Sequence, residues 1–305
     1  MRILVTGAAG FIGFNLCMEL SKHHEVSGID FYKSDPLKIT RTNLLMGKCD
    51  IQQVDIMHDE LPNLHNIDLV IHLAAIADVM RSISHPTDYY NVNVIGTQRI
   101  IDAVSVYNIP VIYASSSSVY SGNGCSYESP YKESDMLGMP TNPYAMSKYV
   151  NESQFKQASI QSWGLRFFTV YGDWGRPEQA LWKFTESVIN DTGIVLRGNG
   201  EYLRDFTHID DLVQAIVCVI DNKPTEDIIN VGSGVATSTS DMVRYISDHL
   251  ETSTDISLEG YNEYESIMTL SDNSILESYG WRAHIDINDG ICKFIDWYQE
   301  SGYGS

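Results

Sequence analysis

The sequence has little positive charge. Its 305 residues include 20 lysines and arginines against 40 aspartates and glutamates, and the formal net charge at pH 7 is −20. Such a chain repels polyanions, which argues against a nucleic-acid partner. Any phosphate or carboxylate on a small substrate must therefore be received by a local cluster drawn from these few cations.

Cysteine is also scarce, and long hydrophobic runs are missing. The cysteines form no CxxC pair and the histidines no HExxH motif, so we expect reduced thiols and no metal site. No apolar stretch is long enough to span a bilayer. The first apolar run begins at Arg2, which leaves no room for a signal peptide, so we expect a cytoplasmic protein. The cysteines are Cys17, Cys49, Cys125, Cys218 and Cys292.

A glycine-rich segment follows this first apolar run. "RILVT" predicts a strand, and "TGAAGFIG" leads from it through a tight turn into a helical pattern. Backbone N–H groups at a helix start, together with glycines that allow close approach, suit a dinucleotide pyrophosphate. The spacing is GxxGxxG, and a β-turn without a ligand is the alternative. The cofactor-binding residues predicted here are Gly7, Gly10, Phe11, Ile12 and Gly13.

An acid ends the next predicted strand, "EVSGID". Asp30 lies about 20 residues after the glycines, the distance at which a carboxylate accepts hydrogen bonds from the adenosine ribose. A carboxylate there repels the 2′-phosphate of NADP. We therefore predict that the cofactor is NAD.

Short apolar runs alternate with helical patterns through the first half of the chain. This alternation predicts an α/β fold with a doubly wound parallel sheet, and the length leaves room for a smaller C-terminal α/β lobe. We expect residues 1–170 to form the NAD-binding domain, with part of 205–235 returning to it, and residues 171–305 to form mainly an interwoven substrate-binding lobe. Strands are predicted at residues 2–6, 26–29, 51–54, 68–73, 110–114 and 227–232, a strand then a loop at 164–172, helices near 11–22, 88–107, 177–190, 211–221 and 287–301, and a long loop at 121–142.

Hydroxyl groups follow the fifth predicted strand. Ser115 to Ser118 stand at its carboxyl end, where open α/β sheets bind ligands, so a serine here can touch a sugar hydroxyl. Further along, "NPYAMSK" places Tyr144 and Lys148 on one helical face. An ammonium beside a phenol favours the phenolate, which would make Tyr144 a base for a sugar hydroxyl, and Lys148 could also hold the nicotinamide ribose. Taken alone, the pair is equally an ordinary solvated helix face.

Five motifs together resemble the extended short-chain dehydrogenase/reductase family, the NAD-dependent epimerases and dehydratases. They are "TGAAGFIG", "HLAA", "ASSSSVY", the YxxxK spacing and "RDFTHIDD", and the resemblance covers nearly the whole chain. The segment "GLRFFTVYGDWGRPEQALWKFT" closely resembles the UDP-glucuronate 4-epimerase group. The resemblance implies a Rossmann-type fold, NAD, a UDP-sugar substrate and a homodimer built through the helices near 88–107 and 144–160.

The resemblance also implies a reaction. Such enzymes oxidise C4 of the sugar, let the 4-keto intermediate turn over within the site and return the hydride to the opposite face. Ser116 then takes the position that hydrogen-bonds the 4-oxygen, with Tyr144 as acid/base. At the positions of Ser117 and Ser118, 4,6-dehydratases usually have Asp and Glu, and decarboxylases tend to have the Glu. Because this chain has a hydroxyl at both positions, the resemblance implies epimerisation without dehydration or decarboxylation.

Hydroxyls suit a uronic acid as well. Oxidation at C4 gives a β-keto acid, which loses carbon dioxide easily when its carboxylate is desolvated or badly oriented. We assign Ser117, Ser118 and Thr169 to holding this carboxylate. A turn that merely caps the strand is the alternative for the serines.

Two arginines are candidates for the anionic groups of a UDP sugar acid, because a guanidinium suits phosphate and carboxylate oxygens. Arg204 in "YLRDF" resembles the diphosphate-binding arginine of the family, and Arg176 in "WGRP" is a second candidate for the diphosphate or carboxylate. Either is alternatively a surface ion-pair partner, Arg204 with Asp205 for example. Other family positions imply contacts with the cofactor. Asp55 and Ile56 would lie near adenine, and Leu73, Ala74 and Ala75 along the adenosine diphosphate, with ordinary packing as the alternative for the last three.

Three interpretations stay open. The first is a UDP-glucuronate 4-epimerase. The second is a related enzyme, either a 4-epimerase of UDP-glucose or UDP-N-acetylglucosamine or a UDP-sugar dehydratase or decarboxylase. Two departures from the glucuronate group keep it open. Met80 stands at a usual arginine position and is followed by Arg81, and acidic "EGYNEYES" replaces a basic segment. The third is a non-catalytic NAD-sensing protein. The Ser116, Tyr144 and Lys148 set counts against the third.

Overall fold

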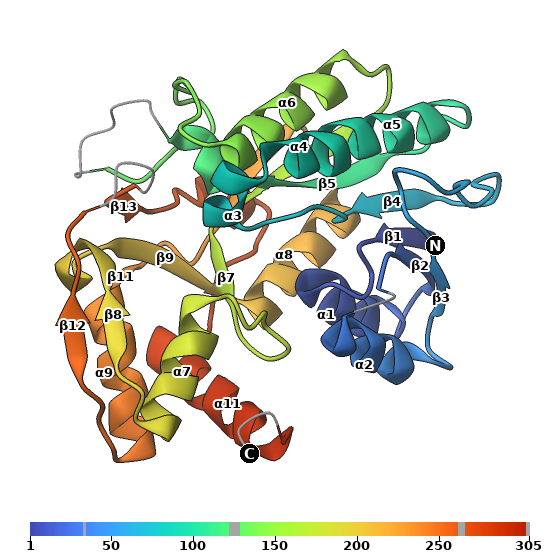
Figure 1. The fold of residues 1–305 in the computed structure, drawn as a ribbon. Coiled ribbons are helices and arrows are strands. Elements are labelled where there is room, and N and C mark those ends of the chain that lie inside the picture. The colour runs from blue at the N-terminus through green and yellow to red at the C-terminus, as the bar shows by residue number, and fades with distance from the viewer. Residues whose placement is uncertain (33–34, 122–128, 262–265, 303–305) are drawn as a thin grey trace. The chain divides into compact units, whose positions relative to one another are not determined.

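The computed structural model describes residues 1–32, 35–121, 129–261 and 266–302 (Figure 1). Cys125 and part of the predicted loop at 121–142 lie outside these residues. The chain divides into two compact units. The N-terminal unit comprises Met1–Asn123, Met136–Arg166 and Lys223–Ile229, and the C-terminal unit comprises Gly124–Asp135, Phe167–Asn222 and Asn230–Ser305. The predicted division into domains at residue 170 remains a prediction.

A seven-stranded sheet organises the N-terminal unit, in the order β10-β6-β5-β4-β1-β2-β3. Strands β3, β2, β1, β4 and β5 run parallel, and β4 is buried along its whole length, as expected of a sheet covered on both faces. The predicted doubly wound fold is confirmed. The strands are β1 (Arg2–Thr6), β2 (Glu25–Asp30), β3 (Asp50–Gln53), β4 (Leu69–His72), β5 (Val111–Ser116), β6 (Ser162–Phe167) and β10 (Ile228–Val231).

The strand order reverses between β1 and β4. From β1 the chain adds β2 and β3 on one side, and then β4 and β5 on the other. Ligands of such sheets bind beyond the carboxyl ends of the strands at this switch point. The helices of the unit are α1 (Phe11–Leu20), α2 (Pro36–Leu45), α3 (Val79–Ser84), α4 (Pro86–Tyr89), α5 (Thr97–Ser105) and α6 (Pro143–Gln157). In Figure 1, α5 and α6 lie side by side, and the two helices are in contact.

The helix predicted near 88–107 is not uniform. Residues Tyr90–Gly96 between α4 and α5 form a π-helix, η1. The carbonyl of Asn93 accepts hydrogen bonds from the side chains of Thr97 and Asn151, at 2.6 and 2.7 Å. In a regular α-helix this carbonyl would accept a hydrogen bond from a backbone N–H of the same helix. Turns of π-helix are frequent at functional sites.

A four-stranded sheet forms the frame of the C-terminal unit. Its central strand β9 pairs with β7 and β13 in parallel and with β11 antiparallel. The segment predicted as a strand then a loop at 164–172 is two strands, because β7 leaves the first sheet and pairs with β9. The strands of this sheet are β7 (Thr169–Tyr171), β9 (Leu203–His208), β11 (Ala236–Ser238) and β13 (Met268–Thr269). Two further strands, β8 (Ile194–Leu196) and β12 (Ile256–Leu258), pair in parallel as a separate two-stranded sheet.

Helices α7, α9 and α11 enclose the core of this unit. The core contains Trp182 from α7, Ile246 from α9 and Phe294 from α11, all buried. None of the helices in the described ranges is both long enough and apolar enough to cross a membrane. The helices are α7 (Ala180–Asn190), α8 (Ile209–Asn222), α9 (Thr239–Leu250), α10 (Ser274–Ser278) and α11 (Ile287–Glu300), of which α9 and α10 were not predicted.

Candidate functional site

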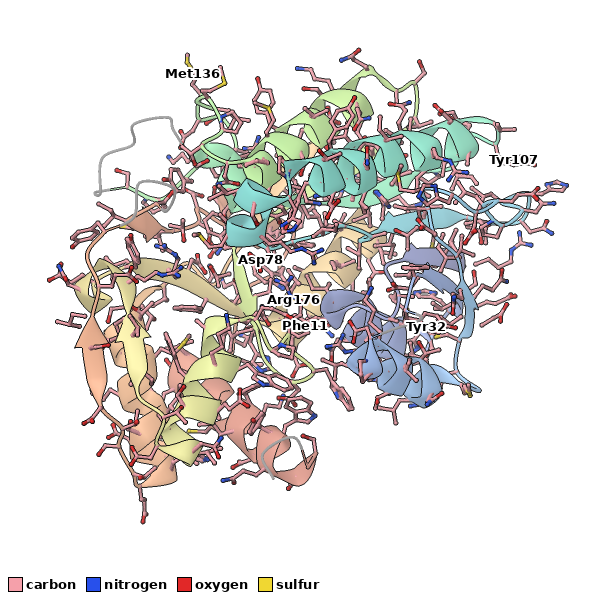
Figure 2. All side chains as sticks on the ribbon, viewed as in Figure 1. Phe11, Tyr32, Asp78, Tyr107, Met136 and Arg176 are labelled. Atoms are coloured by element: carbon pink, nitrogen blue, oxygen red, sulfur yellow. The ribbon has the colours of Figure 1, made fainter. Side chains whose placement is uncertain are left out.

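The glycine-rich turn between β1 and α1 is closely packed. Gly7 has a φ of 72°, and a Cβ added there would meet the backbone N of Ala74 at 2.8 Å. A Cβ at Gly13 would lie 2.1 Å from the carbonyl oxygen of Gly7. Helix α1 begins at Phe11 (Figure 2), and its N-cap Gly10 offers no side-chain cap to the first N–H groups. Such a helix start fits a pyrophosphate, because its free N–H groups and dipole both favour an anion.

The predicted ribose acid, Asp30, is buried at the end of β2. Its Oδ2 accepts a hydrogen bond from the backbone N of Ala9 at 2.9 Å, which ties the glycine turn to β2. Its Oδ1 accepts one from Lys38 Nζ of α2 at 2.8 Å. Lys38 was missed by the sequence analysis, because α2 was not predicted. The segment "DPLK", an N-cap acid followed by proline, is the signal that would have indicated this helix.

The other predicted cofactor residues lie in loops at the carboxyl ends of β3 and β4. After β3, Asp55 accepts from the backbone N of Met57 at 2.8 Å, whereas the side chain of Ile56 belongs to the core. After β4, the backbone N of Ala74 donates to Thr6 Oγ1 at 3.1 Å. Leu73 and Ala75 flank it and are half-buried. These residues therefore share the sheet edge with the glycine turn.

A histidine that was part of the "HLAA" motif but had no predicted role supports this edge. His72 ends β4, with its Nδ1 2.7 Å from Thr6 Oγ1 and its Nε2 2.9 Å from Thr97 Oγ1. Burial, and to a smaller extent the charge of Lys148, lower the pKa of His72 to about 3. His72 is therefore neutral at physiological pH and links β1 to α5.

The serine run forms the end of β5 and the start of a 3₁₀-helix, η2 (Ser117–Tyr120). Ser116 Oγ accepts from the backbone N of Ser118 at 3.2 Å and from Ser118 Oγ at 2.9 Å. Ser116 is thus the N-cap of η2. Because Ser116 Oγ accepts both of these hydrogen bonds, its own proton can still be donated to a ligand. Ser117 is half-buried.

Tyr144 and Lys148 lie on α6, which packs against β5 and η2. Pro143 begins the helix, and Asn142 Oδ1 caps it by accepting from the backbone N of Ala145 at 2.9 Å. Lys148 is buried and its Nζ donates to the carbonyl of Ala114 on β5 at 2.8 Å. Burial lowers the pKa of Lys148 to about 8. The pair is therefore not an ordinary solvated helix face.

The predicted substrate residues Thr169, Arg176 and Arg204 belong to the C-terminal unit. Thr169 begins β7 and pairs with Phe206 of β9. Arg176, labelled in Figure 2, is half-buried beyond β7, and its backbone N donates to Gln179 Oε1 at 2.9 Å. The guanidinium of Arg204 lies 4.8 Å from the ring centroid of Tyr202.

Asp205, which the alternative interpretation pairs with Arg204, has a different role. It is fully buried, and its Oδ1 accepts from the backbone N and the hydroxyl of Ser233. Its Oδ2 accepts from the backbone N and the hydroxyl of Ser271, and from the backbone N of Gly234. Adjacent strand residues point to opposite faces, so Asp205 holds these loops onto β9 while Arg204 faces away from them.

Metal ligands are not clustered in the part of the chain that the structure describes, where no group of three or more His, Cys, Asp or Glu side chains could hold an ion. The prediction that the protein has no metal site stays a prediction.

Comparison with known proteins places these features in a family. The sequence model of the NAD dependent epimerase/dehydratase family matches residues 3–232. Protein CapI of Staphylococcus aureus is 33% identical over 98% of this chain and 99% of its own length. The structure of a UDP-glucuronic acid 4-epimerase from Bacillus cereus, in complex with UDP-glucuronic acid and NAD, is 29% identical with a TM-score of 0.90 and covers 99% of this chain and 100% of its own.

A second solved structure names a different sugar. A UDP-N-acetylglucosamine 4-epimerase from Methanobrevibacter ruminantium, in complex with UDP-N-acetylmuramic acid, is 27% identical with a TM-score of 0.88 and covers 98% of both chains. The predicted family, fold and cofactor are confirmed. The glycine turn, the uncapped start of α1 and Asp30 fit NAD, and the chain belongs to the NAD-dependent epimerase/dehydratase family.

Proposed function

We propose that this protein is an NAD-dependent 4-epimerase that interconverts UDP-glucuronate and UDP-galacturonate through a 4-keto intermediate. The observation that carries the proposal is the row of hydroxyls at the end of β5. Ser117 and Ser118 offer no carboxylate for dehydration or decarboxylation, and Ser118 Oγ donates to Ser116 at 2.9 Å. The similarity to the Bacillus cereus enzyme, which extends over the whole chain, supports this choice of substrate.

Three residues of the N-terminal unit carry the proposed chemistry. Ser116 donates a hydrogen bond to the 4-oxygen of the sugar, and the phenolate of Tyr144 removes the hydroxyl proton and later returns it. Lys148 stabilises the phenolate and holds the nicotinamide ribose. Bound NAD would supply the hydride chemistry at C4, as the acceptor of the hydride and as its donor to the opposite face. It is not consumed overall, and its predicted contacts are those at the sheet edge described above.

Substrate recognition falls to hydroxyls and arginines. Ser117, Ser118 and Thr169 hold the uronate carboxylate by hydrogen bonds, which keeps the β-keto acid from losing carbon dioxide. Because a hydroxyl has a single proton, Ser118 donates to the carboxylate only when its hydroxyl turns away from Ser116 Oγ on sugar binding. Arg204 binds the diphosphate, and Arg176 binds the diphosphate or the carboxylate. A chain with a net charge of −20 needs such local cations to receive a UDP sugar acid.

A 4-epimerase of a neutral UDP sugar is the second candidate. It is favoured by the similarity to the Methanobrevibacter ruminantium enzyme and by Met80, which is 38% exposed at a position where an arginine was expected. A related dehydratase or decarboxylase would need acids where Ser117 and Ser118 stand. An NAD-sensing protein would not need the Ser116, Tyr144 and Lys148 set.

We further propose that the protein is a cytoplasmic homodimer. Large apolar side chains are exposed on the two helical segments that the family resemblance assigns to a dimer interface. They are Tyr90 and Ile95 on η1 and Met146 and Tyr149 on α6. No nucleic-acid or membrane partner is proposed.

Product analysis tests the proposed reaction. Purified protein is incubated with UDP-glucuronate, UDP-glucose or UDP-N-acetylglucosamine, with and without added NAD, and the products are identified by proton NMR. We expect UDP-galacturonate from the first sugar and no release of carbon dioxide. Epimerisation of a neutral sugar alone would contradict the assignment of Thr169 and Arg176 to a carboxylate, and no turnover of any sugar would favour the NAD-sensing alternative.

A further inference from the structure

A buried ion pair lies behind the strand end that carries Ser116. Arg166 of β6 and Glu152 of α6 form two hydrogen bonds, Nε to Oε1 at 2.9 Å and Nη2 to Oε2 at 2.8 Å. Their side chains are 4% and 11% exposed. Burial opposes the charge of Arg166, but the hydrogen bond and the charge of Glu152 together hold the pKa of the guanidinium above its ordinary value. The pair is therefore a fixed, charged element of the N-terminal unit.

This pair binds the chain on both sides of Ser116. Ser115 Oγ donates to Glu152 Oε1 at 2.5 Å, so the residue immediately before Ser116 is tied to α6. Arg166 Nη1 donates to the hydroxyl of Tyr120 at 2.8 Å, and the guanidinium lies 4.6 Å from the centroid of the Tyr120 ring. Tyr120 ends η2, so the pair clamps both ends of the segment that contains Ser116, Ser117 and Ser118.

The same contacts align α6 with β5. Tyr144, Lys148 and Glu152 follow one another at intervals of four residues and therefore share one side of the helix. Lys148 donates to the carbonyl of Ala114, and Glu152 accepts from the next residue, Ser115. Two side chains of α6 thus hold two consecutive residues of β5. These two hydrogen bonds fix α6 against β5, and they therefore fix where Tyr144 on the helix lies relative to Ser116 on the strand.

Stability alone does not account for such a pair. Removing two charges from water costs about as much as their attraction returns, and a well-packed apolar pair is often as stable. Apolar side chains, however, cannot orient the hydroxyls of Ser115 and Tyr120, because only hydrogen-bonding groups fix the angle of a hydroxyl.

We propose that Glu152 and Arg166 are positioning residues for the epimerisation, which fix the Ser116 hydroxyl relative to the phenol of Tyr144 by clamping Ser115 and Tyr120. The proposal rests on the proposed function, because that function gives Ser116 and Tyr144 their roles. Glu152 and Arg166 act through their neighbours and not on the sugar.

Substitutions of Ser115 test the clamp with little effect on folding. Ser115→Ala removes the hydroxyl that Glu152 binds and leaves the two hydrogen bonds to Arg166 in place. Ser115→Thr keeps the hydroxyl and suits a strand, so it is the matched control. We expect kcat to fall about 10- to 100-fold in Ser115→Ala, the size of effect that a small misplacement of reacting groups produces. The KM for UDP-glucuronate should stay within about twofold of the wild-type value, because the clamp does not touch the substrate, and Ser115→Thr should recover most of kcat.

A double-mutant cycle separates positioning from general destabilisation. If Glu152 acts through Ser115, then Ser115→Ala should lower kcat no further in a Glu152→Ala background. Independent effects that multiply would overturn the proposal, and so would a wild-type kcat in Ser115→Ala. Glu152→Ala leaves a buried guanidinium unpaired, and if it does not fold, the comparison of Ser115→Ala with Ser115→Thr decides alone.

Amide hydrogen exchange keeps the clamp testable if the substrate is wrong. Residues 116–121 should exchange faster in Ser115→Ala than in the wild type or in Ser115→Thr, whether or not the protein turns over a UDP sugar. A wild-type protein that epimerises none of the three UDP sugars would refute the proposed function alone. Unchanged exchange in residues 116–121 of Ser115→Ala would refute the clamp alone.

Discussion

Individual side chains at the end of β5 and on α6 divide the proposed chemistry between them. Ser116 keeps its proton for a ligand because both of its hydrogen bonds from Ser118 are accepted ones. Lys148 is buried and its pKa is lowered to about 8, so the site holds an amine that loses its charge readily. Ser117 and Ser118 place hydroxyls and not carboxylates directly after Ser116, which suits a substrate whose keto form is prone to decarboxylation.

Tyr144→Phe tests the proposed base. The substitution keeps the ring, whose centroid lies 6.3 Å from that of Tyr89 in an edge-on contact, and removes only the phenolic oxygen. We expect kcat for UDP-glucuronate to fall by about 10²- to 10⁴-fold, the usual contribution of a general base. The melting temperature should be unchanged. Wild-type turnover in this variant, measured by proton NMR, would refute the assignment.

Lys148 makes the stability of the protein depend on pH. Its pKa is about 8 in the folded chain, against an ordinary value of 10.5, so between these values the unfolded chain binds the extra proton. The free energy of unfolding should therefore rise with pH over this window, by up to about 1.4 kcal/mol per pH unit from this group. We expect Lys148→Met to lack this rise in urea titrations of the protein without NAD. The matched control is Lys156→Met, an exposed position on the same helix, and an identical pH dependence in Lys148→Met and the wild type would contradict the prediction.

At the scale of secondary structure, the junction of β1 and α1 depends on close approach of backbone to backbone. Gly7 leaves no room for a Cβ beside Ala74, and Gly13 leaves none beside the carbonyl of Gly7. The turn is held further by Asp30, which binds the backbone N of Ala9. The first N–H groups of α1 are consequently held in place for an anion.

Gly13→Ala should disturb this junction. The added Cβ would lie 2.1 Å from a backbone oxygen, so α1 must shift away from the turn. We expect a loss of stability of about 1–3 kcal/mol and weaker NAD binding by calorimetry. Gly260→Ala is the control, because nothing lies within 4 Å of a Cβ added there, and both measurements should be unaffected in it. NAD binding of wild-type strength in Gly13→Ala would rule out a close approach of the cofactor at this helix start.

The whole molecule carries two features that no single element shows. Its acidity confines anion recognition to a few arginines, of which Arg176 and Arg204 are the proposed ones. Exposed apolar side chains on η1 and α6 would become buried against a second copy in the proposed homodimer, which would be favourable.

Light scattering after size-exclusion chromatography tests the homodimer. We expect twice the chain mass of 34.3 kDa for the wild type. Tyr149→Glu should yield the single-chain mass, because a charge would be buried unpaired at the interface. Val195→Glu introduces the same charge at a 59% exposed position on β8 and should leave the dimer intact. A monomeric wild type would refute the proposal directly.

The features that were predictable from the sequence are those in which neighbouring residues determine the structure. The β1 strand, the glycine turn and α1 occupy one short segment, and the spacing of Tyr144 and Lys148 needs only a helix that begins at Pro143. Family, fold class and NAD followed from such local motifs and are confirmed. The catalytic and substrate-binding residues stay predictions, since their roles depend on a bound sugar.

The remaining features depend on residues that are distant in the chain and meet only after folding. Lys38 reaches Asp30 from a helix that hydrophobic periodicity did not reveal, and β7 becomes a strand only because β9 pairs with it. Glu152 could have been noticed four residues after Lys148, but nothing local indicates that Arg166 binds it or that Ser115 and Tyr120 bind the pair. Local spacing thus fixed the motifs, whereas the long-range hydrogen bonds that align them were decided by the packing of α6 and β6 against β5.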